Sequence, residues 1–260
     1  MTNYPITDSL IYQSDSVKLY CADTLNLLQT FPNNSIDMIF ADPPYFLSNG
    51  GVTCVSGKFA SVNKGDWDSG LTLQERHEFN RNWLSLCYTV LRNPGTIWVS
   101  GTFHNIYSIG MALEESGFQV INNITWQKTN PPPNLACKSF THSTETILWA
   151  KKRNAKKSTF NYSVMKTLNN NKQMKDVWTG TTTPQKEKKL GKHPAQKPEY
   201  ILDRIILAST NEGDIILDPF CGSGTTGVVA SRLHRNFIGI DSDKSYLDIT
   251  KRRIEETHES

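Results

Sequence analysis

The 260-residue sequence has no long apolar run and no recognisable arrangement of cysteines. No segment approaches the ~20 apolar residues that a membrane-spanning helix needs, and the first residues lack the basic and apolar parts of a signal peptide. The cysteines form no CxxC pair and have no histidine at metal-ligand spacing. We therefore expect neither a disulfide framework nor a metal site, and reduced thiols in a cytoplasmic protein. The five cysteines are Cys21, Cys54, Cys87, Cys137 and Cys221.

Net charge is also small, at +3, but it is unevenly distributed. Residues 151–197 contain 13 basic and two acidic residues, a local charge of +11, which leaves −8 on the remainder. Such asymmetry favours an anionic partner, although a solvated polar surface would also explain it. The aromatic residues Phe160, Tyr162 and Trp178 in this segment favour nucleic acid, because bases offer ring faces for stacking as well as phosphates.

Short apolar segments alternate with helical patterns along the chain. The alternation predicts an α/β fold, with a mostly parallel sheet and helices on both faces. The predicted strands are 17–21, 36–41, 96–100, 120–126, 145–150, 214–217 and 237–240. The predicted helices are 25–30, 73–91, 103–115, 199–209, 225–234 and 244–256.

Two segments interrupt this alternation. Residues 46–71 are rich in Gly, Ser and Asn and predict a long mobile loop directly after a strand. Residues 151–192 show little periodicity and predict a basic insertion. The length suits one large domain carrying such an insertion, so we expect a single catalytic domain over residues 1–260.

A glycine-rich turn follows the predicted strand 214–217. Gly222, Gly224 and Gly227 match the pattern G-x-G-x-x-G, and Asp241 ends the next apolar strand 19 positions after Gly222. In nucleotide-binding α/β folds the glycines let the backbone approach the ligand, and such an acidic residue binds ribose hydroxyls. An ordinary strand–turn–helix is the alternative, but the spacing of the acid favours a nucleotide site.

The residues around this turn discriminate between nucleotides. Asp218 would place a carboxylate beside the helix N-terminus, where it would repel the pyrophosphate of NAD and attract the sulfonium and ammonium groups of S-adenosylmethionine. Only about one helix follows Asp241, so most of the sheet must come from earlier in the chain, in a permuted order. Charge and chain order both favour the methyl donor over an NAD-dependent dehydrogenase.

A second turn, Asp42-Pro43-Pro44-Tyr45, follows the predicted strand 36–41. The prolines stiffen it and fix the direction of the Pro43 carbonyl. A carboxylate, a fixed carbonyl and an aromatic ring suit an adenine N6 amine. Two acceptors would draw its hydrogens out of the ring plane, and Tyr45 would stack on the base after it is flipped out of the duplex. A rigid surface turn is the alternative.

Together these motifs resemble those of the β-class amino-DNA methyltransferases, with DPPY early and DPFCGSGTTG late. The segment His193-Pro194-Ala195-Gln196-Lys197-Pro198 is similar to the family's motif X. The likeness covers essentially the whole chain, least over the basic segment. The stretches DPPYFLSNGG and KGDWDSG are most similar to the MboII/DpnII-type adenine methyltransferases of type II restriction–modification systems.

The resemblance implies a permuted Rossmann-like fold with a seven-stranded sheet that binds S-adenosylmethionine. By this likeness Asp241 holds the ribose hydroxyls, Asp23 contacts the cofactor's adenine, and Thr225 with the 193–197 turn brackets the methionine group. The implied catalytic residues are Asp42, Pro43, Pro44 and Tyr45. The implied cofactor-binding residues are Cys21, Ala22, Asp23, Asp42, His193, Gln196, Lys197, Asp218, Phe220, Cys221, Gly222, Ser223, Gly224, Thr225, Thr226, Asp241 and Ser242.

The implied reaction is direct displacement, in which adenine N6 of duplex DNA attacks the sulfonium methyl group and host DNA becomes protected from a cognate endonuclease. No covalent nucleophile is needed, so Cys221 is expected to be a packing residue. Target recognition is assigned to residues 151–192 together with 46–71. Family members are often dimers, so the resemblance also implies a homodimer.

Other functions remain open at this point. Cytosine-N4 methylation uses a similar turn, usually with serine in place of Asp42, and an RNA or protein substrate would need the same cofactor. An NAD-dependent dehydrogenase would explain the glycine turn but not DPPY. A non-catalytic DNA-binding protein would explain the charge but not the cofactor turn.

Overall fold

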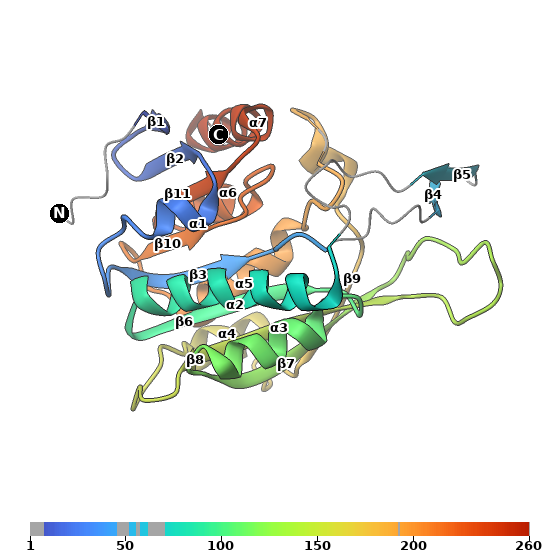
Figure 1. Cartoon of the computed structure of the whole chain (residues 1–260), viewed down its shortest axis with the longest axis horizontal. Helices are drawn as coiled ribbons and strands as arrows, with labels where there is room; N and C mark the ends of the chain where they lie inside the picture. Colours follow the sequence, from blue (N-terminus) through green and yellow to red (C-terminus); the bar gives the residue numbers. More distant parts are fainter. Residues whose placement is uncertain (1–7, 46–51, 56–57, 62–70, 192, 260) are drawn as a thin grey trace.

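One nine-stranded sheet forms the centre of the protein (Figure 1). The computed structural model describes residues 8–45, 52–55, 58–61, 71–191 and 193–259. In spatial order the strands are β1 (Leu10–Gln13), β2 (Val17–Cys21), β11 (Asn236–Asp241), β10 (Ile215–Asp218), β3 (Ile36–Ala41), β6 (Leu91–Gly101), β8 (Thr144–Lys152), β7 (Phe118–Lys128) and β9 (Val177–Gly180). A separate hairpin pairs β4 (Val52–Val55) with β5 (Lys58–Ser61).

The middle of the sheet is parallel: β2, β11, β10, β3 and β6 all run in one direction. Strand β8 runs against both of its neighbours, and β1 runs against β2. The carboxyl ends of β2, β11, β10 and β3 therefore lie together at one side of the sheet, which we call the carboxyl edge. In open α/β sheets this edge is where ligands bind.

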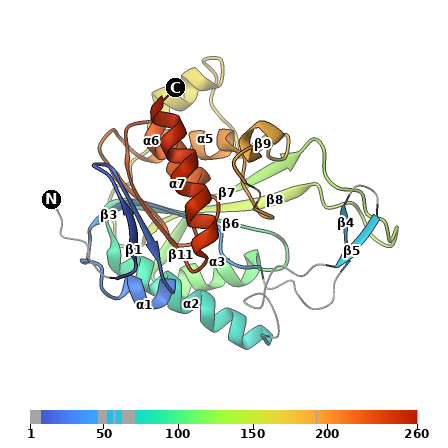
Figure 2. The same cartoon turned by 90° about the horizontal axis from the view of Figure 1, so that it is seen from above.

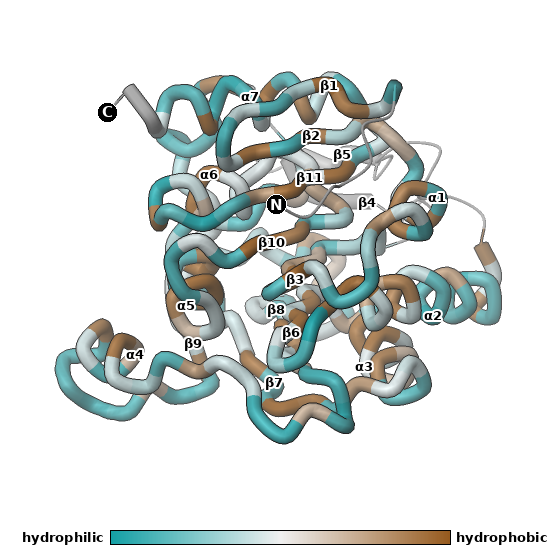
Figure 3. The backbone as a smooth tube through the Cα atoms, turned by 90° about the vertical axis from the view of Figure 1, so that its left-hand side faces the viewer, coloured by the Kyte–Doolittle hydropathy of each residue, from teal (hydrophilic) through white to brown (hydrophobic). Residues whose placement is uncertain are grey.

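Helices cover both faces of the sheet, and each face has its own hydrophobic core (Figure 2). One core packs α1 (Thr24–Leu28), α2 (Leu73–Val90) and α3 (Ile106–Glu115) onto the sheet. The other packs α4 (Tyr162–Leu168), α5 (Glu199–Ser209), α6 (Thr225–Arg232) and α7 (Lys244–Glu259). Central strands such as β10 and β11 are largely hydrophobic, as expected for strands buried on both faces (Figure 3).

The predicted α/β class is confirmed, and all seven predicted strands are present in the main sheet. The expected count of seven is wrong, because β1 and β9 add a strand at each end. Both additions are four-residue edge strands. Edge strands have a ladder partner on one side only and bury less apolar surface, so their sequences carry a weaker strand pattern.

The basic segment 151–192 is more regular than its sequence suggests. It contributes the end of β8, helix α4, strand β9 and a short 3₁₀ helix, η2 (Gln185–Lys188). Met165 of α4 and Trp178 of β9 are buried in the core. Of the predicted loop 46–71, residues 46–51, 56–57 and 62–70 lie outside the described residues, and β4 and β5 form the hairpin within it.

No helix in the described part of the chain is both long and apolar enough to cross a membrane. Cys21, Cys87, Cys137 and Cys221 carry free thiols. Burial raises the pKa of the Cys221 thiol well above its usual range, and the charges of Asp218 and Asp241 act in the same direction. Cys221 is 6% exposed, so its side chain packs inside the glycine-rich turn.

Candidate cofactor and catalytic site

A cavity of about 630 Å³ lies at the carboxyl edge, where β2, β3, β10 and β11 end. It brings together the DPPY turn after β3, the glycine-rich turn after β10 and the segment after residue 192. The predicted residues that line it are Ala22, Asp23, Asp42, Pro43, Pro44, Tyr45, His193, Phe220, Gly222, Asp241 and Ser242. Segments 200 residues apart in sequence thus meet because their parallel strands end at the same edge.

The glycine-rich turn forms one wall of this cavity. The backbone N–H of Gly222 donates to Asp241 Oδ2 at 2.7 Å, which ties the turn after β10 to the end of β11. Gly222 and Gly224 have φ values of 53° and 72°, in the left-handed region that favours glycine. The remaining predicted cofactor residues are not among those that line the cavity: Cys21, Gln196, Lys197, Asp218, Cys221, Ser223, Gly224, Thr225 and Thr226.

Asp218 shapes the turn from inside. The side chain is 3% exposed and accepts hydrogen bonds from the Thr226 hydroxyl at 2.5 Å and from the Phe220 N–H at 3.1 Å. Burial raises the pKa of this carboxyl to about 7. Asp218 does not line the cavity, and its two hydrogen bonds order the turn that does.

Carboxylates dominate the charge of the cavity lining. Among the described residues, Asp23, Asp42, Asp241 and Asp243 line it, against the single ammonium group of Lys244. Burial raises the pKa of Asp241, although N–H groups of Asp243 and Gly222 that donate to it act in the opposite direction. A cation beside such a carboxylate would favour its ionised form. The lining therefore fits a ligand with positively charged groups.

Several lining residues were missed by the sequence analysis. Phe79 of α2 packs 6.2 Å from Phe220, and Tyr246 of α7 packs edge-on against His193 at 4.5 Å, measured between ring centroids. These aromatic residues carry no local motif, since their helices are brought to the cavity by tertiary packing. Pro194 and Ala195 also line the cavity, within the predicted 193–197 turn, and the further lining residues are Thr24, Leu25, Leu71, Pro219, Asp243 and Lys244. The last two follow Asp241 closely in the strand-end loop, a signal that could have found them.

Three donors hold the Asp42 carboxylate at the opposite wall. Its Oδ1 accepts hydrogen bonds from the Ser100 hydroxyl and from the Tyr45 hydroxyl, the latter at 2.5 Å. Its Oδ2 accepts from the Lys197 ammonium, also at 2.5 Å. Asp42 is thus a fixed, charge-balanced acceptor at the end of β3.

Tyr45 has a role that the sequence analysis did not anticipate. Its ring lines the cavity, so the expected stacking on a base stays a prediction, and its hydroxyl donates to Asp42 and accepts from Lys197, the latter at 2.9 Å. Burial raises the pKa of Tyr45 well above 10, with the charge of Asp42 adding to the effect. The neutral hydroxyl therefore orients the carboxylate.

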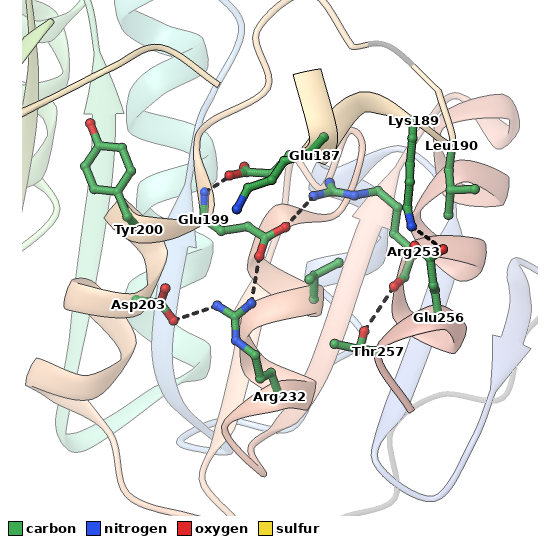
Figure 4. Close-up of a pocket in the computed structure, with 12 residues that line it drawn as sticks. Glu187, Lys189, Leu190, Glu199, Tyr200, Asp203, Arg232, Arg253, Glu256 and Thr257 are labelled. Atoms are coloured by element: carbon green, nitrogen blue, oxygen red, sulfur yellow. Dashed lines mark hydrogen bonds and ion pairs between the residues drawn. The ribbon is translucent and has the colours of Figure 1, made fainter. Parts of the chain in front are cut away.

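A second cavity, of about 660 Å³, lies behind the glycine-rich turn between α5, η2 and α7 (Figure 4). Charged side chains line it, and they pair with one another. Glu199 accepts from Arg232 at 2.7 Å and from Arg253 at 3.3 Å. Arg253 also donates to the carbonyl of Ser223 at 2.7 Å and to the Thr225 hydroxyl at 3.2 Å. The network thus anchors the turn to helices α5 and α7.

Replacing Arg253 by methionine is expected to loosen the turn. Loss of hydrogen bonds from a charged donor costs about 2 kcal/mol, so we expect a comparable loss in free energy of unfolding and a roughly tenfold rise in the Kd of the nucleotide ligand. Urea unfolding and calorimetric titration measure these quantities. The control is Arg252→Met, since Arg252 is exposed on the same helix. Equal effects of the two changes would contradict the anchoring role.

Comparison with known proteins agrees with this geometry. A family profile described as DNA methylase matches residues 36–252. The chain is 60% identical to the type II methyltransferase M2.DpnII of Streptococcus pneumoniae, over 96% of this chain and 93% of the relative. It is 47% identical to the type II methyltransferase M2.MboI of Moraxella bovis, over 94% and 90%.

Solved structures show the same architecture. The crystal structure of the M1.HpyAVI–SAM complex matches with a TM-score of 0.69 and 29% identity, over 92% of this chain and 98% of that one. The PvuII cytosine-N4-specific DNA methyltransferase matches with a TM-score of 0.74 at 20% identity, over 96% and 93%, which supports the fold. The family profile spans both the DPPY turn after β3 and the glycine-rich turn after β10. The resemblance predicted from the motifs is confirmed: the chain belongs to the DNA methylase family.

Proposed function

We propose that this protein transfers a methyl group from S-adenosylmethionine to adenine N6 in duplex DNA, at a specific sequence. The observation that carries the proposal is the Asp42 carboxylate, fixed by three donors at the wall of the acidic cavity. Serine is the usual residue at this position in cytosine-N4 enzymes. The chain's similarity to the type II methyltransferases M2.DpnII and M2.MboI supports a place in a restriction–modification system.

The cavity suits S-adenosylmethionine in its charge and in its apolar surface. The acidic lining matches its ammonium and sulfonium groups, and Asp241 and Asp23 stand at strand ends where ribose and adenine contacts are made in nucleotide-binding sheets. Phe220, Phe79 and Tyr246 supply apolar surface. When bound, S-adenosylmethionine supplies a methyl group that a nitrogen lone pair can displace.

The protein's own contribution is to position the adenine amine. Asp42 and the Pro43 carbonyl are two acceptors for the two N6 hydrogens, and Pro44 stiffens the turn that carries them. Accepting both hydrogens out of the ring plane directs the lone pair toward the methyl donor. Such orientation accounts for most of the rate enhancement that we expect, and no covalent step is needed.

Labelled methyl transfer tests the proposal directly. The protein is incubated with methyl-labelled S-adenosylmethionine and duplex DNA, and the DNA is digested to nucleosides. Label in N6-methyladenine supports the proposal, whereas label in N4-methylcytosine would assign the chain to the other branch of the family. Label in RNA or protein alone, or no label at all, would overturn it.

The setting follows from the same proposal. We place the enzyme in the cytoplasm, where it would protect host DNA against a cognate endonuclease and work as a homodimer. Four free thiols are consistent with a reducing compartment. Sedimentation at working concentrations tests the dimer.

We infer that target recognition uses only part of the basic segment, together with residues 46–71. Glu145, at the start of β8, lies beside the site, because it pairs with Lys197. Lys152, at the other end of this strand, lies about 23 Å away at 3.3 Å per residue. Residues 151–161 therefore lie toward the opposite edge, where Asn161 bonds the last turn of α5. Residues 177–191 and the β7–β8 connection, 129–143, lie nearer the carboxyl edge (Figure 1).

Salt dependence tests this division. Affinity for duplex DNA is expected to fall steeply with salt, because each phosphate contact releases counterions. Lys138→Ala/Lys186→Ala should lower the slope of log affinity against log salt by about 1.8, at 0.9 per contact. Lys166→Ala/Lys172→Ala is the control, because these exposed lysines lie in and just after α4. Equal slopes for both double variants would contradict the division, and a flat wild-type profile would contradict the DNA contact itself.

A further inference from the structure

Lys197 lies in a different place from the one that its motif suggests. The resemblance implies that it binds the cofactor, yet its side chain is 6% exposed and does not line the cavity. Its ammonium group lies 2.5 Å from Asp42 Oδ2, 2.9 Å from the Tyr45 hydroxyl and 3.5 Å from Glu145 Oε2. The first two contacts are hydrogen bonds from the ammonium group, and the third is an ion pair that leaves Glu145 Oε2 without a hydrogen-bond partner.

The same contacts determine how Asp42 can meet a substrate. A carboxylate offers about four acceptor positions, two on each oxygen. Ser100 and Tyr45 occupy both positions on Oδ1, and Lys197 occupies one on Oδ2. One position on Oδ2 remains for the hydrogen of an amine. Lys197 therefore determines which oxygen the amine reaches and in which direction that oxygen points.

Glu145 holds Lys197 in turn. It comes from the start of β8, and its second oxygen pairs with Lys128 of β7 at 2.5 Å. The resulting chain of charges alternates in sign, from Asp42 through Lys197 and Glu145 to Lys128. Burial alone would lower the pKa of Lys197, but the charges of Asp42 and Glu145 and the hydrogen bond to Asp42 act in the opposite direction and hold that pKa well above its usual range. Lys197 thus remains a cation and does not serve as a proton acceptor.

We propose that Lys197 is the positioning residue of the catalytic carboxylate: held by Glu145, it fixes Asp42 with a single open acceptor position on Oδ2 for the target amine. This inference rests on the proposed function, because it concerns the same methyl transfer. It assigns Lys197 to the substrate side of the site instead of the cofactor side.

The Lys197→Met variant separates these two assignments. Because misplacement of a reacting group by about 1 Å can cost 10²-fold, we expect kcat to fall by about that factor. The Kd of S-adenosylhomocysteine and the KM for DNA should stay within about threefold, since Lys197 lines neither surface. A rise of tenfold or more in the Kd, with kcat near the wild-type value at saturation, would overturn the proposal and restore the cofactor role.

Two further variants exclude a merely structural role. Lys197→Met leaves the Asp42 and Glu145 carboxylates buried without their shared cation, which can lower the melting temperature. Lys197→Met/Glu145→Gln removes one of these charges and is expected to recover melting temperature while kcat stays low. Recovery of kcat as well would overturn the proposal. The control is Lys152→Met, which removes another buried lysine, at the far end of β8. Lys152 donates to Asn34 Oδ1 at 3.1 Å, away from the site, so its loss should leave kcat unchanged.

A double-mutant cycle tests whether Lys197 acts through Asp42. In the Asp42→Asn background, measured by single-turnover transfer of labelled methyl, Lys197→Met should lower the rate by less than about threefold, because the carboxylate that it positions is gone. If Lys197→Met lowered the rate in this background by the same factor as in the wild type, Lys197 would act elsewhere and the proposal would be overturned. The wild-type protein is assayed in parallel: an inactive wild type rejects the proposed function, whereas an active wild type with an unimpaired Lys197→Met variant rejects only this inference.

Discussion

Replacing Asp42 by alanine is expected to lower the rate of methyl transfer by at least about 10³-fold, the scale on which loss of a fixed electrostatic group acts in enzyme sites. The variant would lose one of the two acceptors that orient the amine, and no other described carboxylate receives hydrogen bonds from Ser100, Tyr45 and Lys197 together. Transfer of labelled methyl to duplex DNA measures the rate. Calorimetric titration with S-adenosylhomocysteine should give a Kd within a few-fold of wild type, because the glycine-rich turn and Asp241 remain in place.

The fold should tolerate the loss of Asp42. Lys197 keeps its ion pair with Glu145 and its hydrogen bond from the ammonium to the Tyr45 hydroxyl, so no buried cation is left unpaired. Asp37 provides the matched control. It lies at the other end of β3, pairs with Arg92 at 2.9 Å and accepts from the Ile215 N–H at 2.8 Å. Asp37→Ala should cost stability but leave kcat unchanged. Near-normal turnover of the Asp42→Ala variant would refute the catalytic assignment.

Replacing Gly224 by alanine is expected to be the most destabilising single change in the cofactor turn. The new Cβ would overlap the side chain of Thr250, whose Cβ would be 2.7 Å away, and Gly224 has a φ of 72°. Left-handed backbone costs about 1–2 kcal/mol for a residue with a Cβ, and overpacking a core costs about 1–3 kcal/mol more. We therefore expect the free energy of unfolding to fall by about 2–5 kcal/mol, since both penalties apply. Urea denaturation monitored by tryptophan fluorescence measures it.

A second glycine separates the two penalties. Gly213 also has a positive φ, of 81°, but no atom lies within 4 Å of where its Cβ would be. Gly213→Ala should therefore cost only the backbone term, about 1–2 kcal/mol, and should leave nucleotide affinity unchanged. If the Gly224→Ala variant were no less stable than the Gly213→Ala variant, the close contact between the turn and α7 would not be the reason that residue 224 is a glycine.

Sequence patterns predicted the interior of the sheet better than its margins. Strands such as β3 and β10 are buried on both faces and are therefore continuous apolar runs, which are easily recognised. β9 was missed because it lies in a charged segment and depends on pairing with β7, about 50 residues earlier. Its Trp178 is nevertheless buried, so tertiary packing determined the strand where local pattern did not.

The candidate site divides in a similar way. Residues at strand ends, such as Asp23, Asp42 and Asp241, could be placed together because parallel strands end at one edge. Phe79 and Tyr246 could not, since their positions depend on how α2 and α7 pack. For Lys197 the motif implied a cofactor contact, which stays a prediction, whereas the structure shows a hydrogen bond from its ammonium group to Asp42 that the motif did not indicate. A motif gives the position of a lysine in the chain, whereas the direction of its long side chain is determined by the charges around it.

The pairing of β3 with β10 has a consequence for how the protein is made. Met38 lies opposite Ile216, and Ile39 opposite Leu217, so neighbours in the middle of the sheet are synthesised about 180 residues apart. The nascent chain must carry β3 with one edge unpaired until β10 leaves the ribosome, and closing so large a loop slows folding. The DPPY turn emerges early and the glycine-rich turn emerges late. No partly synthesised chain can therefore assemble both walls of the site, and methylation waits for the completed sheet.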